Sequence, residues 1–437
     1  MATTNNSTLH TLYINARLID PATGRDEMGG ILCDGKVISD IGPHLNDGKP
    51  RANSQIINCK GHCLVPGLVD MRAHLGEPGE EHKETLETAG RSAVAGGVTT
   101  IVCLPNTEPA IDDMSVVEFV ARRARKLGLS KVYPYGAVSK KLEGKEIAEL
   151  GMLSEAGAVA FTDGFKTISD IQLMLRALSY AKTFDLLIVQ HPEECGLSKN
   201  GVMNSGETAT RLGLGGIPRY AEIIMVERDI RLVEMSGGKL HFAHLSTSDA
   251  IDCVRKAKAR GLAVTCDTAP PYFALNELAV GDYRTFAKLS PPLRKEEDRQ
   301  AVIEGLKDGT IDVIVSDHTP QDEESKRLPF SEAAAGGVGL ETLLPITLEL
   351  YHNGHMSLIE ALNLITYRPA QLLGLKAGKL EIGRRADITI LDPERGWKVE
   401  DKTLKSKSKN SPFDGRPVQG CAIQTIVDGR LVFQAEG

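Results

Sequence analysis

The stretch "CLVPGLVDMRAH" (residues 63–74) indicates the fold of this chain. A β-branched, apolar run ends here in the polar residues Asp70, Arg72 and His74. Seven more runs of the same kind follow, at 99–106, 131–138, 156–164, 186–193, 239–246, 262–270 and 311–320. Helix-length segments separate them, and such alternation is typical of a parallel sheet. Eight units predict a closed (β/α)₈ TIM-type barrel.

The two ends of the chain have a different pattern. Residues 11–66 and 386–433 contain short alternating strands with Asp-Gly turn signals at 34–35 and 428–429. Strands of this kind need partners to bury their apolar face, so both ends are predicted to form one small β-sandwich. The expected domains are 1–66 and 376–437 for the sandwich and 67–375 for the barrel. The polar linker 401–417 is predicted to lie on the surface.

The composition excludes several classes of protein. The 437 residues carry a net charge of −7, which argues against a nucleic-acid partner. No run approaches the roughly 18 apolar residues of a membrane span. The N-terminal "MATTNNSTLH" lacks the features of a signal peptide, so a cytoplasmic protein is expected. The eight scattered cysteines are typical of reduced, buried thiols.

Polar residues collect where the predicted barrel strands end. Asp163, His191, His244 and Asp317 end strands four, five, six and eight, and His74 ends strand one. A single such histidine is more often structural, and Asp317 alone could cap a helix. Three histidines and two carboxylates converging at one barrel face predict a site for divalent metal, with zinc favoured and a carboxylate able to bridge two ions.

Many segments together resemble the bacterial type I dihydroorotases of the amidohydrolase superfamily. They include "VPGLVDMRAHLGEPGEEHKET", "CLPNTEP", "AFTDG", "VQHPEE", "FAHLSTSDA", "SPPLRKEEDRQAV", "SDHTP", "GLETLLP" and "SKSKNSPFDG", in the family's order. The resemblance implies interconversion of carbamoyl-aspartate and dihydroorotate in pyrimidine synthesis. It implies one Zn²⁺ on His74 and Asp317, another on His191 and His244, and Asp163 as the bridge. Asp317 would also transfer the proton between water and the ring nitrogen.

The sequence departs from the family motif at several positions. Arg72 stands where the family has the first histidine of Asp-x-His-x-His, and Gly76 where it has the arginine that binds the substrate carboxylate. A guanidinium has no lone pair for a metal. Ser290 replaces an asparagine and Gln321 a histidine at substrate-contacting positions, whereas Asn106 is kept. Arg72 could itself bind the substrate carboxylate in place of the missing arginine.

These observations leave three hypotheses. Retention of Asp163, His191, His244 and Asp317 favours an active, metal-dependent dihydroorotase with one or two ions. The changes at 72, 76, 290 and 321 fit a non-catalytic dihydroorotase-like chain that supports assembly of aspartate transcarbamoylase. A dihydropyrimidinase or allantoinase is disfavoured, because strand four ends in "FTDG" rather than in the lysine that bridges the metals of those relatives. A homo-oligomer is expected in each case.

Overall fold

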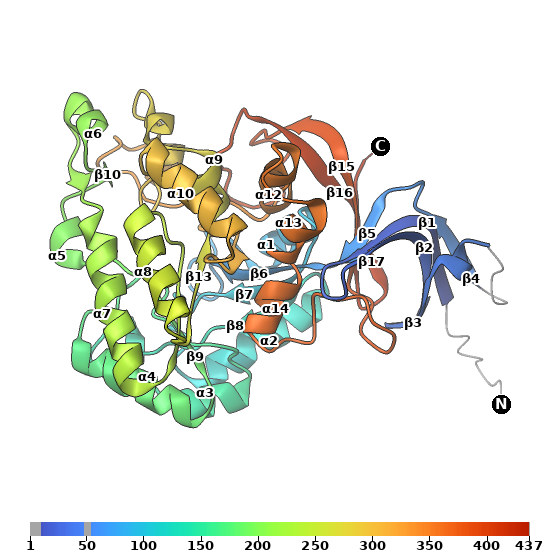
Figure 1. The fold of residues 1–437 in the computed structure, drawn as a ribbon, viewed down its shortest axis with the longest axis horizontal. Helices are drawn as coiled ribbons and strands as arrows, with labels where there is room; N and C mark the ends of the chain where they lie inside the picture. The colour runs from blue at the N-terminus through green and yellow to red at the C-terminus, as the bar shows by residue number, and fades with distance from the viewer. Residues whose placement is uncertain (1–9, 48–53, 437) are drawn as a thin grey trace.

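The structure is a computed structural model that describes residues 10–47 and 54–436 (Figure 1). It has a large helix-covered body and a smaller all-β part that carries the first and last strands. Residues 1–9 lie outside the described residues. The predicted domain 1–66 and the expectation about a signal peptide both include them. Within the described ranges no helix is both long enough and apolar enough to cross a membrane.

The body is built on a ring of parallel strands. They are β6 (Leu68–Ala73), β7 (Val98–Cys103), β8 (Lys131–Pro134), β9 (Leu187–Gln190), β12 (Lys239–Phe242), β13 (Val264–Thr268) and β14 (Val313–Ile314). Phe161 bridges Gly136 on one side and Ile188 on the other, and Ala73 bridges His318. These bridges join β6-β7-β8 to β9-β12-β13-β14 at both edges. The predicted barrel is therefore confirmed, although its fourth strand is reduced to the bridged Phe161.

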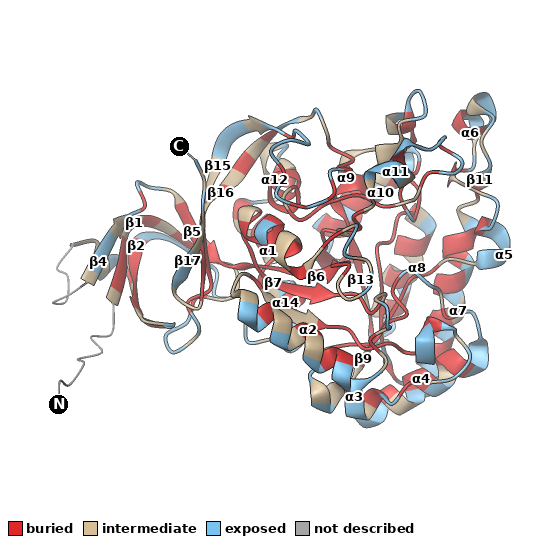
Figure 2. Cartoon of the chain, turned by 180° about the vertical axis from the view of Figure 1, so that it is seen from behind, coloured by how far each residue is buried: buried red, intermediate tan, exposed pale blue. Residues whose placement is uncertain are grey.

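Helices cover the outside of the ring. The longer ones are α1 (Leu86–Ala95), α2 (Met114–Leu127), α3 (Leu150–Ala156), α4 (Ile171–Thr183), α7 (Tyr220–Ser236), α8 (Ser248–Ala259), α10 (Glu296–Lys307) and α12 (Leu343–His352). Short α-helices lie in the connections: α5 (Cys195–Ser198), α6 (Glu207–Leu212), α9 (Pro270–Ala274), α11 (Glu323–Arg327), α13 (Leu358–Asn363) and α14 (Tyr367–Leu372). The connections also hold η2 (Lys140–Leu142), η3 (Glu277–Val280), η4 (Thr285–Ala287), β10 (Met203–Asn204) and β11 (Gly216–Ile217). Figure 2 shows exposed residues on the outer faces of the helices and buried ones along the strands.

Side-chain caps start several of these helices. The hydroxyl of Thr85 accepts from the N–H of Thr88 in a capping box at α1, and Asp170 and Thr247 cap α4 and α8. Each cap satisfies a backbone N–H that has no partner inside the helix. These caps fix the first turns of α1, α4 and α8.

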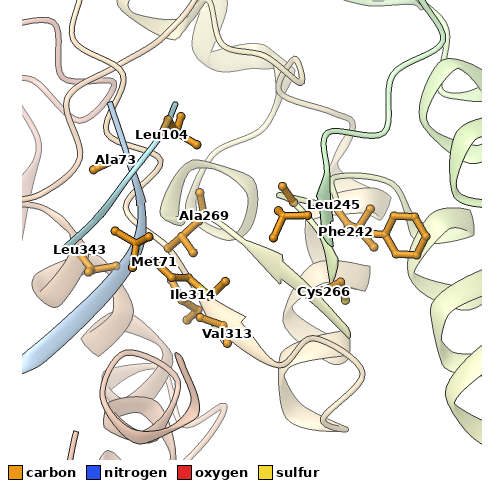
Figure 3. Packing of buried hydrophobic residues seen from close by; sticks show 14 of the residues in the cluster. Met71, Ala73, Leu104, Phe242, Leu245, Cys266, Ala269, Val313, Ile314 and Leu343 are labelled. Atoms are coloured by element: carbon orange, nitrogen blue, oxygen red, sulfur yellow. The ribbon is translucent and has the colours of Figure 1, made fainter. Parts of the chain in front are cut away.

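The main core lies between strands and helices (Figure 3). Met71 and Ala73 of β6 belong to the same buried cluster as Phe242 of β12 and Leu343 of α12. Neighbouring residues on a strand face opposite sides. Arg72, between Met71 and Ala73, therefore faces the inside of the barrel.

Strands from both chain ends form one continuous sheet. Its members are β1 (His10–Asp20), β2 (Arg25–Asp34), β3 (Val37–Gly42), β4 (Ser54–Asn58), β5 (Cys63–Pro66), β15 (Ile388–Lys398), β16 (Pro417–Val427) and β17 (Arg430–Gln434); η1 (Pro43–Asp47) follows β3. The order is β17-β16-β15-β5-β1-β2-β3, with β4 on β1, so the predicted meeting of the ends is confirmed. Asp428 and Gly429 form the expected tight turn with φ of +48° and +70°. The domain boundaries stay predictions.

The linker 401–417 lies only partly on the surface, in contrast to the prediction. Leu404, Ser406, Ser408 and Asn410 are buried, and the lysines between them are exposed. An extended chain places alternate residues on opposite sides, which explains the pattern. The small polar residues face inward because the barrel offers them hydrogen-bond partners.

Candidate functional site

Four predicted site residues meet at the strand ends inside the barrel. Arg72 Nε donates to Oδ1 of Asp317 at 3.1 Å. His244 Nδ1 lies 3.8 Å from the same oxygen, and its Nε2 lies 3.1 Å from Nδ1 of His191. We call these four residues the central cluster. It joins the ends of β6, β9, β12 and β14, as the sequence predicts.

The backbone around Asp317 is held in an unusual conformation. Asp317 and His244 have φ of +47° and +37°, which non-glycine residues seldom adopt. Asp70 accepts from the backbone N–H of Ser316 at 2.9 Å and from its hydroxyl at 2.5 Å. The N–H of His74 donates to the carbonyl of His318 at 2.7 Å. These bonds on both sides of Asp317 fix the direction of its carboxylate.

His74 and Asp163, the other two predicted ligands, make their hydrogen bonds to residues outside the central cluster. His74 Nε2 lies 2.7 Å from Oε2 of Glu80, whose other oxygen pairs with Lys83 Nζ at 2.5 Å. Asp163 Oδ1 accepts from the backbone N–H of Ser139 at 2.9 Å, and Oδ2 accepts from the Ser139 hydroxyl at 2.5 Å. Loop residues that sequence reasoning did not identify thus bind Asp163 and the Nε2 of His74, whereas the buried Nδ1 of His74 has no hydrogen-bond partner among the described residues.

Burial dominates the electrostatics of the central cluster. It raises the pKa of Asp317 to about 7, against the opposing effect of Arg72. Burial, reinforced by the Arg72 charge, lowers the pKa of His191 to about 3 and that of His244 well below its usual value. Both imidazoles are therefore neutral near pH 7, and Arg72 is the fixed positive charge of the cluster.

The donor set does not fit the metal centre that the resemblance implies. Arg72 brings a charged guanidinium without a lone pair to the carboxylate that was expected to bind an ion. His74 and Asp163 point to Glu80 and Ser139. Across residues 10–47 and 54–436, no three His, Cys, Asp or Glu side chains are grouped so that they could hold one ion.

A cavity of about 640 Å³ opens beside this cluster. Its lining includes Asn106, Gln321 and His74, together with Lys83, Lys141, Phe165 and Lys166. Asn106 Nδ2 donates to the carbonyl of Asp163 at 3.2 Å, while its buried Oδ1 has no hydrogen-bond partner among the described residues. Phe165 connects cavity and cluster, because its ring centroid lies 6.0 Å from the Arg72 guanidinium carbon.

The predicted substrate residues Gln321 and Ser290 differ in whether they line the cavity. Gln321 Nε2 donates to the carbonyl of Ala335 at 2.8 Å, and its backbone N–H donates to Oδ1 of Asn410. Ser290 is exposed, and neither it nor Arg72 is among the residues that line the cavity. The structure therefore brings Asn106 and Gln321 to one cavity and leaves Ser290 outside it.

Gly76 has a conformational reason to lack a side chain. Its φ is +68°, and a Cβ there would lie 2.4 Å from the carbonyl oxygen of Glu84. The family's arginine does not fit this loop without a shift of the backbone. The cations that do line the cavity include Lys83, Lys141 and Lys166.

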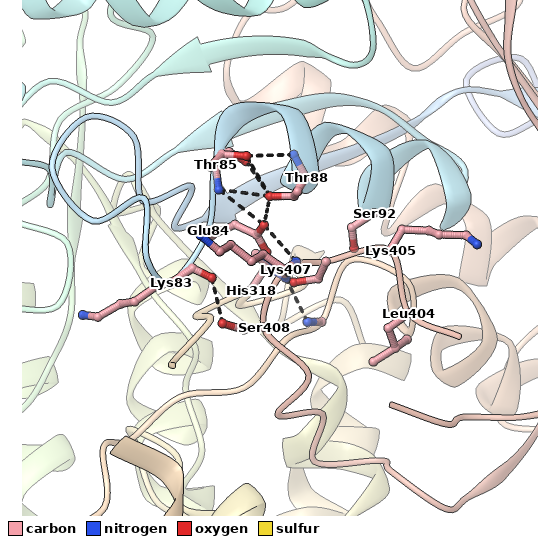
Figure 4. A network of polar contacts seen from close by, with 12 residues as sticks. Lys83, Glu84, Thr85, Thr88, Ser92, His318, Leu404, Lys405, Lys407 and Ser408 are labelled. Carbon is pink, nitrogen blue, oxygen red and sulfur yellow. Dashed lines mark hydrogen bonds and ion pairs between the residues drawn. The ribbon is translucent and has the colours of Figure 1, made fainter. Parts of the chain in front are cut away.

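The segment 404–411, in which buried residues alternate with exposed lysines, links the loops around the mouth (Figure 4). Glu84 is fully buried and accepts from the Ser406 hydroxyl and from the Lys407 N–H at 3.1 Å. Its Oε2 also lies 3.3 Å from Nε2 of His318, next to Asp317. The Ser408 hydroxyl donates to the carbonyl of Lys83. This segment of the C-terminal part thus holds the loops that follow β6 and β14.

Sequence reasoning missed Glu80, Lys83, Glu84 and Phe165 as parts of the site. All four lie in loops, where no periodic pattern marks a residue. The family segments "GEEHKET" and "SKSKN" contain the contacting residues, but their contacts join positions more than 320 residues apart. Only the folded chain places them together.

Known proteins resemble this chain over almost its full length. A family model described as dihydro-orotase-like matches residues 61–250, and one described as amidohydrolase family matches residues 341–433. A dihydroorotase of Anaplasma phagocytophilum is 48% identical over 427 residues, which cover 97% of this chain and 95% of the relative. A dihydroorotase of Syntrophotalea carbinolica is 45% identical over 423 residues, covering 97% and 99%.

Solved structures support the same architecture. The L-hydantoinase of Arthrobacter aurescens aligns with a TM-score of 0.86 at 25% identity and covers 98% of this chain and 96% of its own. The dihydropyrimidinase of Brevibacillus agri aligns with a TM-score of 0.82 at 22% identity, covering 97% and 95%. The hydantoinase likeness at such identity describes the fold, whereas the sequence likeness is far higher to dihydroorotases. The chain therefore belongs to the dihydroorotase family of amidohydrolases.

Proposed function

We propose that the protein interconverts N-carbamoyl-L-aspartate and (S)-dihydroorotate, the cyclisation step of de novo pyrimidine synthesis. The observation that carries this proposal is the likeness to proteins named dihydroorotase, at 42–48% identity over nearly the whole chain. The (β/α)₈ barrel and the strand-end position of Asp317 agree with it, because barrel enzymes place their chemistry at this face.

Asp317 is the proposed proton carrier. In the hydrolytic direction, the oxygen of water bonds to the cyclic amide carbonyl carbon, the C–N bond breaks, and a proton passes from the water to the ring nitrogen. Asp317 would accept that proton and deliver it, and in ring closure the same steps run backwards with loss of water. The contact with Arg72 Nε at 3.1 Å supports this role by holding the carboxylate in one direction.

The 640 Å³ cavity is the proposed substrate site. Asn106 offers an unpartnered carbonyl oxygen that could accept from a ureido N–H, and Gln321 lies in the same lining. Lys83, Lys141 and Lys166 add cations for the substrate carboxylates. Asp317, Arg72 and Ser290 do not line this cavity, so substrate or a loop would have to move to bring them together with the substrate.

No step of this proposal is assigned to Zn²⁺. Metal dependence characterises the family, but the predicted ligands His74, Asp163, His191, His244 and Asp317 do not converge as a metal-binding group in the described part of the chain. What this chain's residues would do is bind and orient the substrate and move the proton at Asp317. Their contribution can be measured by substitution, whatever the metal content of the purified protein.

Turnover of dihydroorotate by the purified protein, followed by chromatography of both compounds, tests the proposal. We expect conversion in both directions, and a rate about 10²–10⁴-fold lower for Asp317→Asn, which keeps the shape but not the proton acceptor. Asp282→Asn, at an exposed position, is the matched control and should leave the rate unchanged. Absence of turnover in the wild-type protein would reject the proposal.

A negative result would direct attention to the non-catalytic hypothesis. The proposed partner is then aspartate transcarbamoylase, and co-elution of the two purified proteins is its test. A homo-oligomer is also proposed, to be measured by light scattering. A cytoplasmic location fits a pathway of soluble metabolites and is tested by fractionation of cells.

A further inference from the structure

We infer that Arg72 is the resident cation of the strand-end site: its guanidinium takes the position of a metal ion beside Asp317 and keeps divalent metal out. The inference goes beyond the proposed reaction, because it concerns which positive charge the site contains. It is tested by metal binding and does not depend on turnover.

The position of Arg72 is the first argument. Its side chain is 3% exposed and starts from β6, on the inward side of the barrel. Nε contacts Asp317 Oδ1 at 3.1 Å, and Nη2 lies 3.4 Å from the carbonyl oxygen of Gly164, directly after Asp163. The guanidinium therefore lies between Asp317 and the backbone next to Asp163, which are two of the predicted ligands.

The second argument is the state of the remaining donors. His74 is paired with Glu80, and both oxygens of Asp163 are engaged by Ser139 and its neighbour Val138. Asp317 directs Oδ1 to Arg72. His74 and His244 each keep a buried Nδ1 that has no hydrogen-bond partner among the described residues, but no three of the predicted ligands in that part of the chain are grouped so that they could hold one ion.

Charge is the third argument. A divalent ion placed on Asp317, His191 and His244 would lie close to a permanent guanidinium charge in a buried setting, where like charges repel strongly. Asp317 balances that guanidinium, and the face of Phe165 lies against it at 6.0 Å. Arg72 and Asp317 therefore balance each other's charge without a metal ion.

One donor of Arg72 remains open. Nη1 is buried and has no hydrogen-bond partner among the described residues. A buried guanidinium N–H without an acceptor favours an anionic or carbonyl oxygen as its ligand, not a cation. Replacing the family's histidine by arginine would thus change the preference of the site from a metal ion to an oxygen of the substrate.

The metal content of the purified protein tests whether Arg72 excludes divalent metal. We would purify the wild-type protein from zinc-supplemented cells, measure bound metals by mass spectrometry, and titrate the chelator-treated protein with zinc chloride by calorimetry. The expected result is no stoichiometric metal and no tight zinc binding. A wild-type protein that retains about one ion or more per chain would overturn the inference.

Three variants at position 72 distinguish the effect of the positive charge from the effect of a missing metal ligand. Arg72→His restores the Asp-x-His-x-His pattern and should gain zinc binding, whereas Arg72→Lys keeps the charge and should not. Arg72→Met removes the charge without adding a ligand, so its zinc affinity should stay below that of Arg72→His. If Arg72→His folds, as judged by circular dichroism, and gains no zinc, Arg72 is not what excludes the ion and the inference fails. If it does not fold, the wild-type measurement alone still decides.

The zinc experiment is independent of the proposed function. A metal-free protein that converts dihydroorotate would support both statements, and a metal-free protein without turnover would support the inference and reject the proposed function. A zinc-loaded, active protein would reject the inference and support the proposed function.

Discussion

Arg72 Nε lies 3.1 Å from Oδ1 of Asp317, although 245 residues separate the two in the sequence. The contact joins the first and last strands of the barrel, next to the bridge between Ala73 and His318 that closes the ring. Asp317 thus keeps a defined direction without any further cation. Arg72, which departs from the family motif, therefore makes its contact where the barrel closes.

Gly76 should not tolerate even a methyl group. Its φ of +68° disfavours other residues, and a Cβ would lie 2.4 Å from the Glu84 carbonyl oxygen. Gly144 is a matched control, with φ of +66° and nothing within 4 Å of its Cβ position. Both alanine variants carry the left-handed cost of about 1–2 kcal/mol, and Gly76→Ala adds the clash. Urea unfolding should show the larger loss for Gly76→Ala; equal losses would contradict the crowding.

Replacing Glu84 by glutamine should destabilise the protein. The carboxylate accepts from the hydroxyls of Thr88 and Ser406 and from the N–H of Lys407. An amide would present an NH₂ group to some of these donors, at a cost of about 1–3 kcal/mol. Thermal unfolding should reveal a lower melting temperature for Glu84→Gln. The control is Glu87→Gln, a half-exposed position in the first turn of α1, where losing the ion pair with Arg91 should cost only about 0.5 kcal/mol.

A buried lysine should make stability depend on pH. Lys326 Nζ donates to the carbonyls of Ala334 at 2.7 Å and Thr285 at 3.0 Å. Burial, and then the charge of Lys288, lowers its pKa to about 7. Above that pH the unfolded chain binds more protons than the folded one, so the free energy of unfolding rises with pH toward about pH 10.

The matched comparison uses Lys326→Met, which lacks this titration. Denaturant unfolding at about pH 7 and about pH 9.5 should show the wild-type protein gaining stability relative to Lys326→Met as the pH increases. Lys256→Met, at an exposed position, should show no such difference in this range. A constant difference between wild type and Lys326→Met would disprove the lowered pKa.

Truncation of the buried Phe242 side chain tests the packing of the barrel core. It is fully buried in the main cluster, on β12. Truncation to alanine should lower the free energy of unfolding by about 3–5 kcal/mol, through lost burial and a residual cavity. Phe184→Ala, where the side chain is 51% exposed, is the control and should cost far less. Guanidinium chloride unfolding of both variants measures the difference.

Much of the fold followed from local patterns. Strands of β-branched residues alternating with helical segments predicted the barrel, and the polar residue at each strand end predicted that Arg72, His191, His244 and Asp317 would meet. Such predictions succeed because strand periodicity and barrel topology fix where a strand end points. The hydrogen bonds of His74 to Glu80 and of Asp163 to Ser139 involve loop residues that no strand pattern marks.

The sequence by itself determined the family, the parallel barrel and the strand-end position of the central cluster, since these depend on hydrophobic periodicity and residue order. Only the tertiary structure decided that Arg72 pairs with Asp317, that Gly76 has no room for a side chain, and that Ser406 and the backbone of Lys407 bind Glu84. Those contacts depend on which loops pack together, and loop packing is set by long-range burial and hydrogen bonding that no local pattern records.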